Sequence, residues 1–328
     1  MKISVVIPTY NSAKTLAASL RSVFSSLVKP FEIIIVDDHS TDKSAEIAKQ
    51  FPVKLISLEK NYGSGYARNI GVNNSSGEIV FFMDADVTIN ENTLKIVADS
   101  FSNDAKLAAT VGLFSKTHPH KNFFSQYKNL YMHFSFSRIS GYLDFLFTSI
   151  CAIKREAYLN FSRTRLKADD TEVGQRYKIE RRKITLNRNL EVIHLKAYNF
   201  ISFIKNDFTV PYDWARIFLK YRGINHLARY GGFAHAKSNQ IASLVICPLS
   251  LLSLITLKLW PPSIILSFML LGIFLVLNIP FFIFLGKEKG VVFMLQSILL
   301  TYLDMLIMGG GVLSGTFTYL FIHEKRIK

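Results

Sequence analysis

Short apolar runs alternate with polar stretches over the first hundred residues. The pattern predicts buried strands at 3–7, 33–36, 53–58 and 79–83, each rich in β-branched or aromatic residues and ended by polar positions. Between them lie helix-like stretches at 12–24, 45–50 and 66–73, the first with Asn11 and Ser12 as candidate N-caps. Repeated strand–helix units of this length predict an α/β fold with a mainly parallel, Rossmann-like sheet.

The last third of the chain has a different pattern. Between residues 241 and 285 the only charged residue is Lys258, and Trp260-Pro261-Pro262 interrupts the run near its middle. A membrane-spanning helix needs about 20 mostly apolar residues. We therefore predict two spans, at about 241–259 and 263–285. A pair of buried core helices is the alternative, but such helices seldom run this long without a polar face.

A third apolar stretch covers residues 291–322 and is interrupted only by Asp304 and the triplet Gly309-Gly310-Gly311. It is longer than one ordinary span and too short for two. Three arrangements fit: an interfacial helix followed by a span, one long tilted helix, or a re-entrant hairpin. A short basic tail follows, at 323–328.

The distribution of charge indicates a membrane surface as a partner and predicts on which side of the membrane the catalytic domain lies. The chain has 328 residues and a formal net charge of +15, of which +10 falls between residues 154 and 240. A basic excess directly before an apolar region indicates an anionic membrane surface. The basic loop at 287–289 and the basic tail also favour the cytoplasmic side, so we expect an integral membrane protein with its catalytic domain in the cytoplasm.

The two cysteines, Cys151 and Cys247, are too few for a disulfide scaffold, and no Cys/His cluster suggests structural zinc. Nucleic acid is not an expected partner, because the chain lacks a recognition motif and its basic excess adjoins the apolar region. A transporter is a further rival, but Asp304 is the only acid within the predicted spans.

Acidic residues follow two of the predicted strands. Asp37 and Asp38 end the second strand, and Asp84-Ala85-Asp86 ends the fourth. Ligands of open α/β sheets bind outside the carboxyl ends of the strands. Two carboxylates spaced two residues apart in an extended segment point the same way and suit a hard divalent cation, which leaves positions for phosphate oxygens. Taken alone, an Asp-x-Asp motif is also common in loops and caps.

Several motifs in order resemble the signature of family 2 glycosyltransferases of the GT-A fold. The resemblance covers about residues 1–195. The matching segments are Ser4–Asn11, Val36–Asp42, Asn61–Gly63, Ala67–Gly71, Gly77–Asp86, Thr148-Ser149, Lys154–Ala157 and Asp169–Arg176.

This resemblance implies a role for individual residues. A nucleotide-sugar donor would bind at Pro8, Thr9, Tyr10, Asp37, Asp38, Arg68, Asp84 and Asp169. A divalent cation, Mg²⁺ or Mn²⁺, would bind Asp84 and Asp86, with His194 as a late ligand. Asp170 would be the general base, with Asp169 in place of the family's Glu. Two alternatives stay open: Asp169 and Asp170 as a helix N-cap, and His194 as a structural hydrogen-bonder.

Aromatic residues crowd two further segments, 119–147 and 198–222, the second of which also carries lysines and arginines. Aromatic and basic side chains together are typical of a membrane interface. We expect residues 196–240 to form an interfacial segment and both segments to present a lipid acceptor to the site. Ordinary core aromatics beside a solvated basic face are the alternative.

The sequence thus predicts a GT-A catalytic domain at 1–195, followed by the interfacial segment, a membrane region at 241–322 and the basic tail. Its expected activity is inverting, metal-dependent transfer of a sugar from a nucleotide diphosphate to a lipid or lipid-linked acceptor. No Gln-x-x-Arg-Trp follows the base, which favours single transfers over a processive polysaccharide synthase. The remaining alternative is a catalytically silent membrane scaffold of the same fold.

Overall fold

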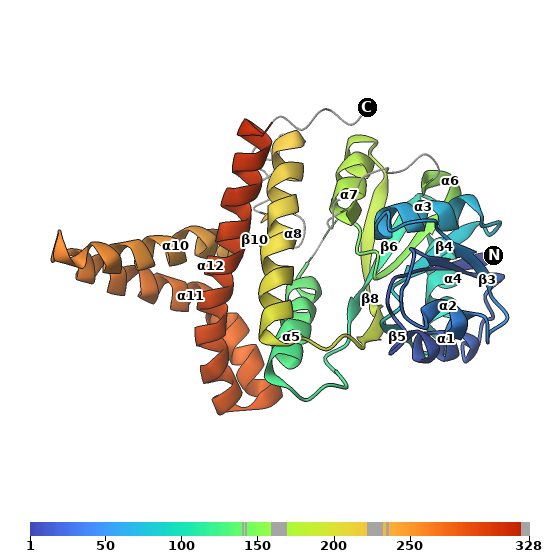
Figure 1. Ribbon diagram of the computed structural model, residues 1–328, viewed down its shortest axis with the longest axis horizontal. Helices are drawn as coiled ribbons and strands as arrows, with labels where there is room; N and C mark the ends of the chain where they lie inside the picture. Colours follow the sequence, from blue (N-terminus) through green and yellow to red (C-terminus); the bar gives the residue numbers. More distant parts are fainter. Residues whose placement is uncertain (140, 142, 159–168, 222–231, 234–235, 323–328) are drawn as a thin grey trace. The chain divides into compact units, whose positions relative to one another are not determined.

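The computed structural model describes residues 1–139, 141, 143–158, 169–221, 232–233 and 236–322. Within these residues the chain forms two compact units (Figure 1). The sheet unit consists of Met1–Lys121 and Phe136–Ala197, and the helical unit consists of Asn122–Ser135 and Tyr198–Lys328.

An eight-stranded sheet forms the centre of the sheet unit. Its strands lie in the order β3-β2-β1-β4-β7-β6-β8-β5. Their bounds are β1 Ile3–Thr9, β2 Glu32–Asp37, β3 Lys54–Ser57, β4 Ile79–Met83, β5 Val87–Ile89, β6 Leu107–Phe114, β7 Ile150–Lys154 and β8 Lys183–His194.

Most of this sheet is parallel. β1 pairs in parallel with both β2 and β4, and β6 with β8, whereas β7 runs antiparallel between β4 and β6. Every residue of β1, β4 and β6 is buried. Burial on both faces explains why these strands have continuous apolar runs instead of alternating polarity.

Helices connect the strands of the sheet unit. They are α1 Leu16–Phe24, α2 Ser44–Ala48, α3 Ser64–Asn73, α4 Thr93–Asn103, α6 Arg155–Tyr158 and α7 Asp169–Ile179.

The predicted N-caps of the first helix are wrong. α1 begins at Leu16, four residues later than expected, and no side chain caps it. Asn11 has a left-handed backbone (φ 49°), and its side chain accepts a hydrogen bond from the amide of Thr41 (2.8 Å). Asn11 therefore connects two loops, and the carbonyl of Ser12 accepts the first amides of the turn that precedes α1.

α3 lies unusually close to the sheet. A Cβ atom added to Gly71 would stand 2.3 Å from a methyl carbon of Val6 in β1, so only glycine permits this approach. Ala67 and Arg68, on the same helix, are buried as well. Close packing of α3 thus brings the Arg68 side chain to the carboxyl ends of the central strands.

Long helices make up the helical unit. They are α5 Phe123–Ser137, α8 Phe200–Lys220, α10 Ser238–Ile255, α11 Ser263–Lys289 and α12 Val291–Phe321, with a two-stranded ribbon, β9 Gly232–Phe233 and β10 Ala236–Lys237. A 3₁₀ turn over Thr256–Lys258 ends α10, and the Trp260–Pro262 segment separates it from α11. α10 and α11 form a hairpin (Figure 1).

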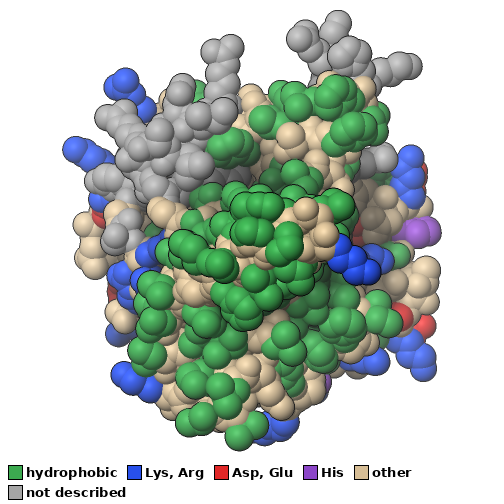
Figure 2. Space-filling view, turned by 90° about the vertical axis from the view of Figure 1, so that its left-hand side faces the viewer, with side chains coloured by type: hydrophobic (Ala, Val, Ile, Leu, Met, Phe, Trp, Pro, Cys, Tyr) green, Lys and Arg blue, Asp and Glu red, His purple; other side chains and the backbone are tan. Residues whose placement is uncertain are grey.

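Three of these helices are long and apolar enough to cross a membrane: residues Ser238–Lys258, Ser263–Lys289 and Val291–Phe321. α12 is one continuous helix of 31 residues through Asp304 and the glycine triplet, so the re-entrant hairpin is not observed. Hydrophobic side chains cover much of one face of the molecule (Figure 2). Phe268 and Leu299, for example, are 67% and 74% exposed. Such extensive apolar exposure is typical of a surface that contacts lipid.

Several aromatic residues predicted at a membrane interface lie in the protein interior instead. Tyr127 and Tyr131 of α5 are buried and pack against Phe281 of α11. Phe136 and Phe145 pack on each other inside the sheet unit. The core alternative is therefore correct for these residues, because their rings are buried against other aromatic rings.

α8 differs from α5 in this respect. It is amphipathic and buries Phe203, Trp214 and Ile217, whereas Phe200 and Ile201 are 44% and 76% exposed. Its exposed apolar residues and its lysines remain compatible with an interfacial position.

The backbones of α8 and α12 touch at small residues. A Cβ on Gly311 would stand 2.3 Å from the carbonyl oxygen of Phe208, and one on Gly315 would stand 2.2 Å from that of Tyr212. A side chain at either glycine could not be accommodated by a rotamer change, because the atoms that it would meet belong to the backbone of α8. The spacing of four residues is the small-xxx-small pattern typical of close helix pairs in membranes.

We predict that Gly311→Ala destabilises the helical unit by about 1–3 kcal/mol, the usual cost of an overpacked core. Gly310→Ala is the matched control, because its added Cβ would make an ordinary 3.6 Å contact with the Phe208 ring. Thermal unfolding of the purified variants measures the difference. Equal melting temperatures would show that α8 and α12 are not in close contact.

Candidate active site

The acidic residues predicted from the strand ends lie at one edge of the sheet. The carboxyl ends of β1, β2 and β4 lie together because these strands are parallel. β7 begins at this edge, since its first residue, Ile150, pairs with Met83 at the end of β4. β8 ends here at His194, which pairs with Val87.

Asp84 is held by two side chains. Arg68 of α3 donates a hydrogen bond to one carboxylate oxygen (2.9 Å), and the hydroxyl of Ser149 donates to the other. The Arg68 side chain is only 5% exposed, against 29% for Asp84. Charge-assisted hydrogen bonds at a partly buried site are stronger than those at the surface. The Asp84 carboxylate is therefore fixed in orientation.

Asp86 faces a histidine. Its carboxylate lies 3.7 Å from Nε2 of His194, whose ring stacks on Phe114 at 4.4 Å between centroids. Burial alone would raise the pKa of Asp86, but the charge and hydrogen bond of His194 outweigh it, so the pKa lies below its usual value. Asp86 is thus ionised at neutral pH. An imidazole and a carboxylate at this distance can both contact the same bound ligand.

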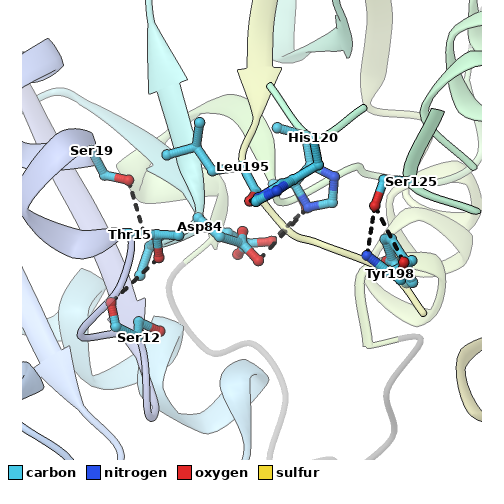
Figure 3. A network of polar contacts seen from close by, with 12 residues as sticks. Ser12, Thr15, Ser19, Asp84, His120, Ser125, Leu195 and Tyr198 are labelled. Carbon is cyan, nitrogen blue, oxygen red and sulfur yellow. Dashed lines mark hydrogen bonds and ion pairs between the residues drawn. The ribbon is translucent and has the colours of Figure 1, made fainter. Parts of the chain in front are cut away.

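Two further histidines lie beside this pair. His118 is buried and contacts the His194 ring edge-on, and burial lowers the pKa of His118 to about 4, so it is neutral near pH 7. Nε2 of His120 lies 3.0 Å from the carbonyl oxygen of Leu195 (Figure 3). The amide of Leu195 donates to the carbonyl of Asp86 (2.7 Å). Sequence reasoning did not single out either histidine, although the His-x-His spacing was visible.

Asp37 and Asp38 are both buried, and their carboxylates stabilise neighbouring loops. Asp37 accepts a hydrogen bond from the amide of Ser40 (3.3 Å). Asp38 accepts two, from the amides of Tyr62 (2.8 Å) and Gly63 (2.7 Å). Asp38 thereby orders the turn that precedes α3. Binding of a nucleotide base by either residue stays a prediction.

The first strand contributes the other predicted donor-binding residues. Pro8 and Thr9 end β1 and are buried, and the Thr9 hydroxyl lies 3.4 Å from the carbonyl oxygen of Ile7. Tyr10 follows the strand and is 49% exposed. An exposed aromatic ring at this edge is available for stacking on a planar ligand.

Asp169 and Asp170 form the first turn of α7. One carboxylate oxygen of Asp170 accepts from the amide of Thr171 (2.7 Å), the next residue of the same helix, so this bond is not an N-cap and the N-cap alternative stays a prediction. The charges of Asp170 and Arg68 act in opposite directions on the pKa of the buried Cys151 thiol, which burial raises. The side chain of Asp169 lies outside the described residues.

A loop at residues 143–149 connects α7 to Asp84. The side-chain amide of Gln175 donates to the carboxylate of Asp144 (2.9 Å), and the amide of Leu146 donates to the carbonyl of Asp170 (3.2 Å). The same loop ends at Ser149, which holds Asp84. Sequence reasoning missed these positioning residues. Thr148-Ser149 was one of the segments that resemble the family, but no role was assigned to Ser149.

The donor atoms at this edge are of kinds that bind divalent cations, but the described side chains are not arranged as a metal site. Asp84, Asp86 and His194 offer carboxylate oxygens and an imidazole nitrogen, which suit Mg²⁺ or Mn²⁺. Among the described residues, no group of three or more His, Cys, Asp or Glu side chains has the geometry of a complete metal site. A cation here would need further oxygens from its ligand, as a diphosphate supplies.

Comparison with known proteins agrees with this geometry. Residues 4–160 match the family described as glycosyl transferase family 2. The chain is 35% identical over 133 residues to the poly(ribitol-phosphate) beta-N-acetylglucosaminyltransferase TarS of Staphylococcus aureus, covering 38% of this chain and 23% of the relative. It is 35% identical over 100 residues to the cholesterol galactosyltransferase of Borreliella burgdorferi, covering 29% of this chain and 28% of the relative. The chain thus spans less than a third of either relative's length.

Among solved structures, the mannosyltransferase PcManGT of Pyrobaculum calidifontis, in complex with GDP-Man and Mn²⁺, has a TM-score of 0.59 and 16% identity. The match covers 98% of this chain and 88% of that one. It confirms the predicted fold class, a mostly parallel sheet typical of the GT-A fold followed by long apolar helices. The chain is therefore similar to family 2 glycosyltransferases over residues 4–160, and its fold is that of a GT-A glycosyltransferase.

Proposed function

We propose that this protein transfers one sugar at a time from a nucleotide-diphosphate donor to a lipid or lipid-linked acceptor, with inversion at the sugar carbon and with a divalent cation. The observation that carries the proposal is the arrangement at one sheet edge. There Asp84 and Arg68 form an ion pair, Asp86 faces His194, and the carbonyl of Asp170 accepts from the amide of Leu146, in the loop that ends at Ser149.

The donor would bind across the ends of β1, β2 and β4. Tyr10 is exposed where a planar base would stack, and Asp37 ends the neighbouring strand. Arg68 already makes one charge-assisted hydrogen bond at the edge and is the cation best placed for the donor's diphosphate. A cation held by Asp84, Asp86 and His194 would supply positive charge against the departing diphosphate.

Asp170 is the proposed base. As the acceptor hydroxyl attacks the anomeric carbon, its proton passes to the Asp170 carboxylate while the bond from that carbon to the diphosphate oxygen breaks. Hydrogen bonds from α7 to Asp144 and from Ser149 to Asp84, at the two ends of one loop, support this assignment. One displacement with one base inverts the configuration of the sugar carbon.

The apolar helices support a membrane acceptor. Three helices are long and apolar enough to span a bilayer, and one curated relative is a cholesterol galactosyltransferase. A soluble enzyme would not need such helices, whereas an enzyme with a lipid acceptor gains access to it from the bilayer. The basic segments before and between the apolar helices favour a catalytic domain on the cytoplasmic side.

We predict that Asp170→Asn reduces sugar transfer by about 10²–10⁴-fold, the usual contribution of a general base. Donor affinity should stay within about twofold, because the substitution removes the proton acceptor and keeps the side chain's shape. Transfer and donor binding are measured separately on purified protein. Asp99→Asn, an exposed carboxylate on α4, is the control. Normal turnover by the Asp170 variant would exclude this residue as the base.

Chelation with EDTA is expected to stop transfer, and added Mn²⁺ or Mg²⁺ to restore it. His194→Gln should raise the metal concentration for half-maximal activity by about 10–100-fold, because an amide is a poorer ligand than an imidazole. Metal titration of both proteins tests this. An unchanged requirement would leave His194 as a structural residue.

The acceptor is tested with the protein in lipid nanodiscs and a panel of radiolabelled nucleotide sugars. We expect label to enter the lipid phase with at least one donor. Label found only on soluble sugars or polymers would contradict a lipid acceptor. Failure to bind any nucleotide sugar in the presence of a divalent cation would instead support the silent scaffold.

A further inference from the structure

A strongly basic cavity lies in the sheet unit, away from the candidate active site. Its volume is about 740 Å³, within the range of small-molecule sites. Among the described residues that line it, Glu156 is the single acid. The basic lining residues are Lys106, Lys154, Lys178, Arg181, Arg182 and Lys183.

This cavity lies at the opposite edge of the sheet from Asp84. It is lined where β6 and β8 begin and where the antiparallel β7 ends. The candidate active site lies where β4 and β8 end and β7 begins. The eight residues of β6 place the two edges about 25 Å apart. A ligand of this cavity is therefore not the sugar donor.

Acids near the cavity balance only part of its charge. Lys183 pairs with Asp104 (2.6 Å), whose pKa this hydrogen bond holds below its usual value, and Arg182 pairs with Glu180. The ammonium group of Lys154 donates to the carbonyl of Ala105 (2.7 Å). Among the described lining residues, one acid, Glu156, stands beside six basic side chains. Like charges gathered around one cavity repel each other, and a bound anion relieves that repulsion.

The backbone of Arg181 is a second, independent observation. After α7, the amide of Arg182 bonds to the carbonyl of Tyr177 (2.8 Å), and the amide of Arg181 bonds to that of Lys178 (3.1 Å). These two bonds form a Schellman motif, whose left-handed residue is usually glycine. Here it is Arg181, with φ 54°. A left-handed arginine has a conformational cost that glycine would not have.

We propose that this cavity binds a phosphate-bearing anion. Its cations come from the residue before β6, the end of β7, α7, the turn after α7 and the start of β8, so several elements direct positive charge to one hollow. Arginine forks and lysine ammonium groups are the side chains that bind phosphate oxygens. The cavity is too large for a simple halide. A soluble polyphosphate and the headgroup of an anionic lipid share the required chemistry.

The test titrates the purified full-length protein in neutral detergent with inorganic tripolyphosphate, and separately with dihexanoyl-phosphatidylglycerol below its micelle concentration. Dihexanoyl-phosphatidylcholine, with the same tails and no net charge, is the lipid control. Calorimetry measures each affinity for the wild type, for Arg181→Gly combined with Lys178→Gln, and for Lys49→Gln. Lys49 is an exposed lysine next to α2, far from the cavity in sequence.

We expect the double variant to lose at least tenfold in affinity for one of the two anions, and Lys49→Gln to bind like the wild type. Because Arg181→Gly relieves a left-handed arginine, its melting temperature should be equal or higher, which separates lost binding from misfolding. If the double variant is unstable, Lys106→Gln on another element gives the same comparison. Any anion bound at the donor site contributes equally to all the proteins compared.

The two ligands distinguish the sources. Preferential loss of phosphatidylglycerol binding identifies a lipid headgroup site, and preferential loss of tripolyphosphate binding identifies a soluble phosphate site. Equal affinities in wild type and cavity variants, or no binding of either anion by the wild type, would overturn the proposal. Neither result depends on catalysis, so the test of anion binding is independent of the test of the proposed transfer reaction.

Discussion

The carboxylate of Asp84 is held between two side chains from opposite directions along the sequence, and the geometry of the candidate site depends on this. Arg68 reaches it from α3, and Ser149 reaches it from the loop before β7. Arg68 can do so because Gly71 lets α3 lie directly on β1. The loop that ends at Ser149 also holds α7 through Asp144 and Gln175. Hydrogen bonds of this loop therefore link Asp84 to α7, the helix that carries Asp170.

The two acids of the Asp-x-Asp motif have different surroundings. Both oxygens of Asp84 accept hydrogen bonds from protein side chains, whereas Asp86 faces His194 at a longer distance. A carboxylate whose oxygens are already satisfied is rigid, and one with a looser partner can exchange that partner for a ligand. This difference makes Asp86 and His194 the more adaptable part of the edge.

Packing in the helical unit follows the rules of a membrane protein. Its helices expose apolar side chains and place polar ones between them, as where Asn278 of α11 bonds to Ser243 of α10 (3.0 Å) and Tyr127 of α5 to Thr301 of α12 (3.0 Å). Lys128 of α5 pairs with Asp207 of α8 in the same interior. Such contacts give specificity to helix association where lipid offers no hydrophobic driving force.

The sequence alone determined the alternation of strands and helices, the strand ends that carry acids, and the positions of the apolar helices. Each depends on periodicity or on motifs within about twenty residues, which are local properties of the chain. Only the tertiary structure decided that Asp38 orders a turn, that Ser149 holds Asp84, that the α5 aromatics are buried, and that lysines from three elements line one cavity. These outcomes depend on partners distant in sequence, and no local pattern specifies which side chains will meet.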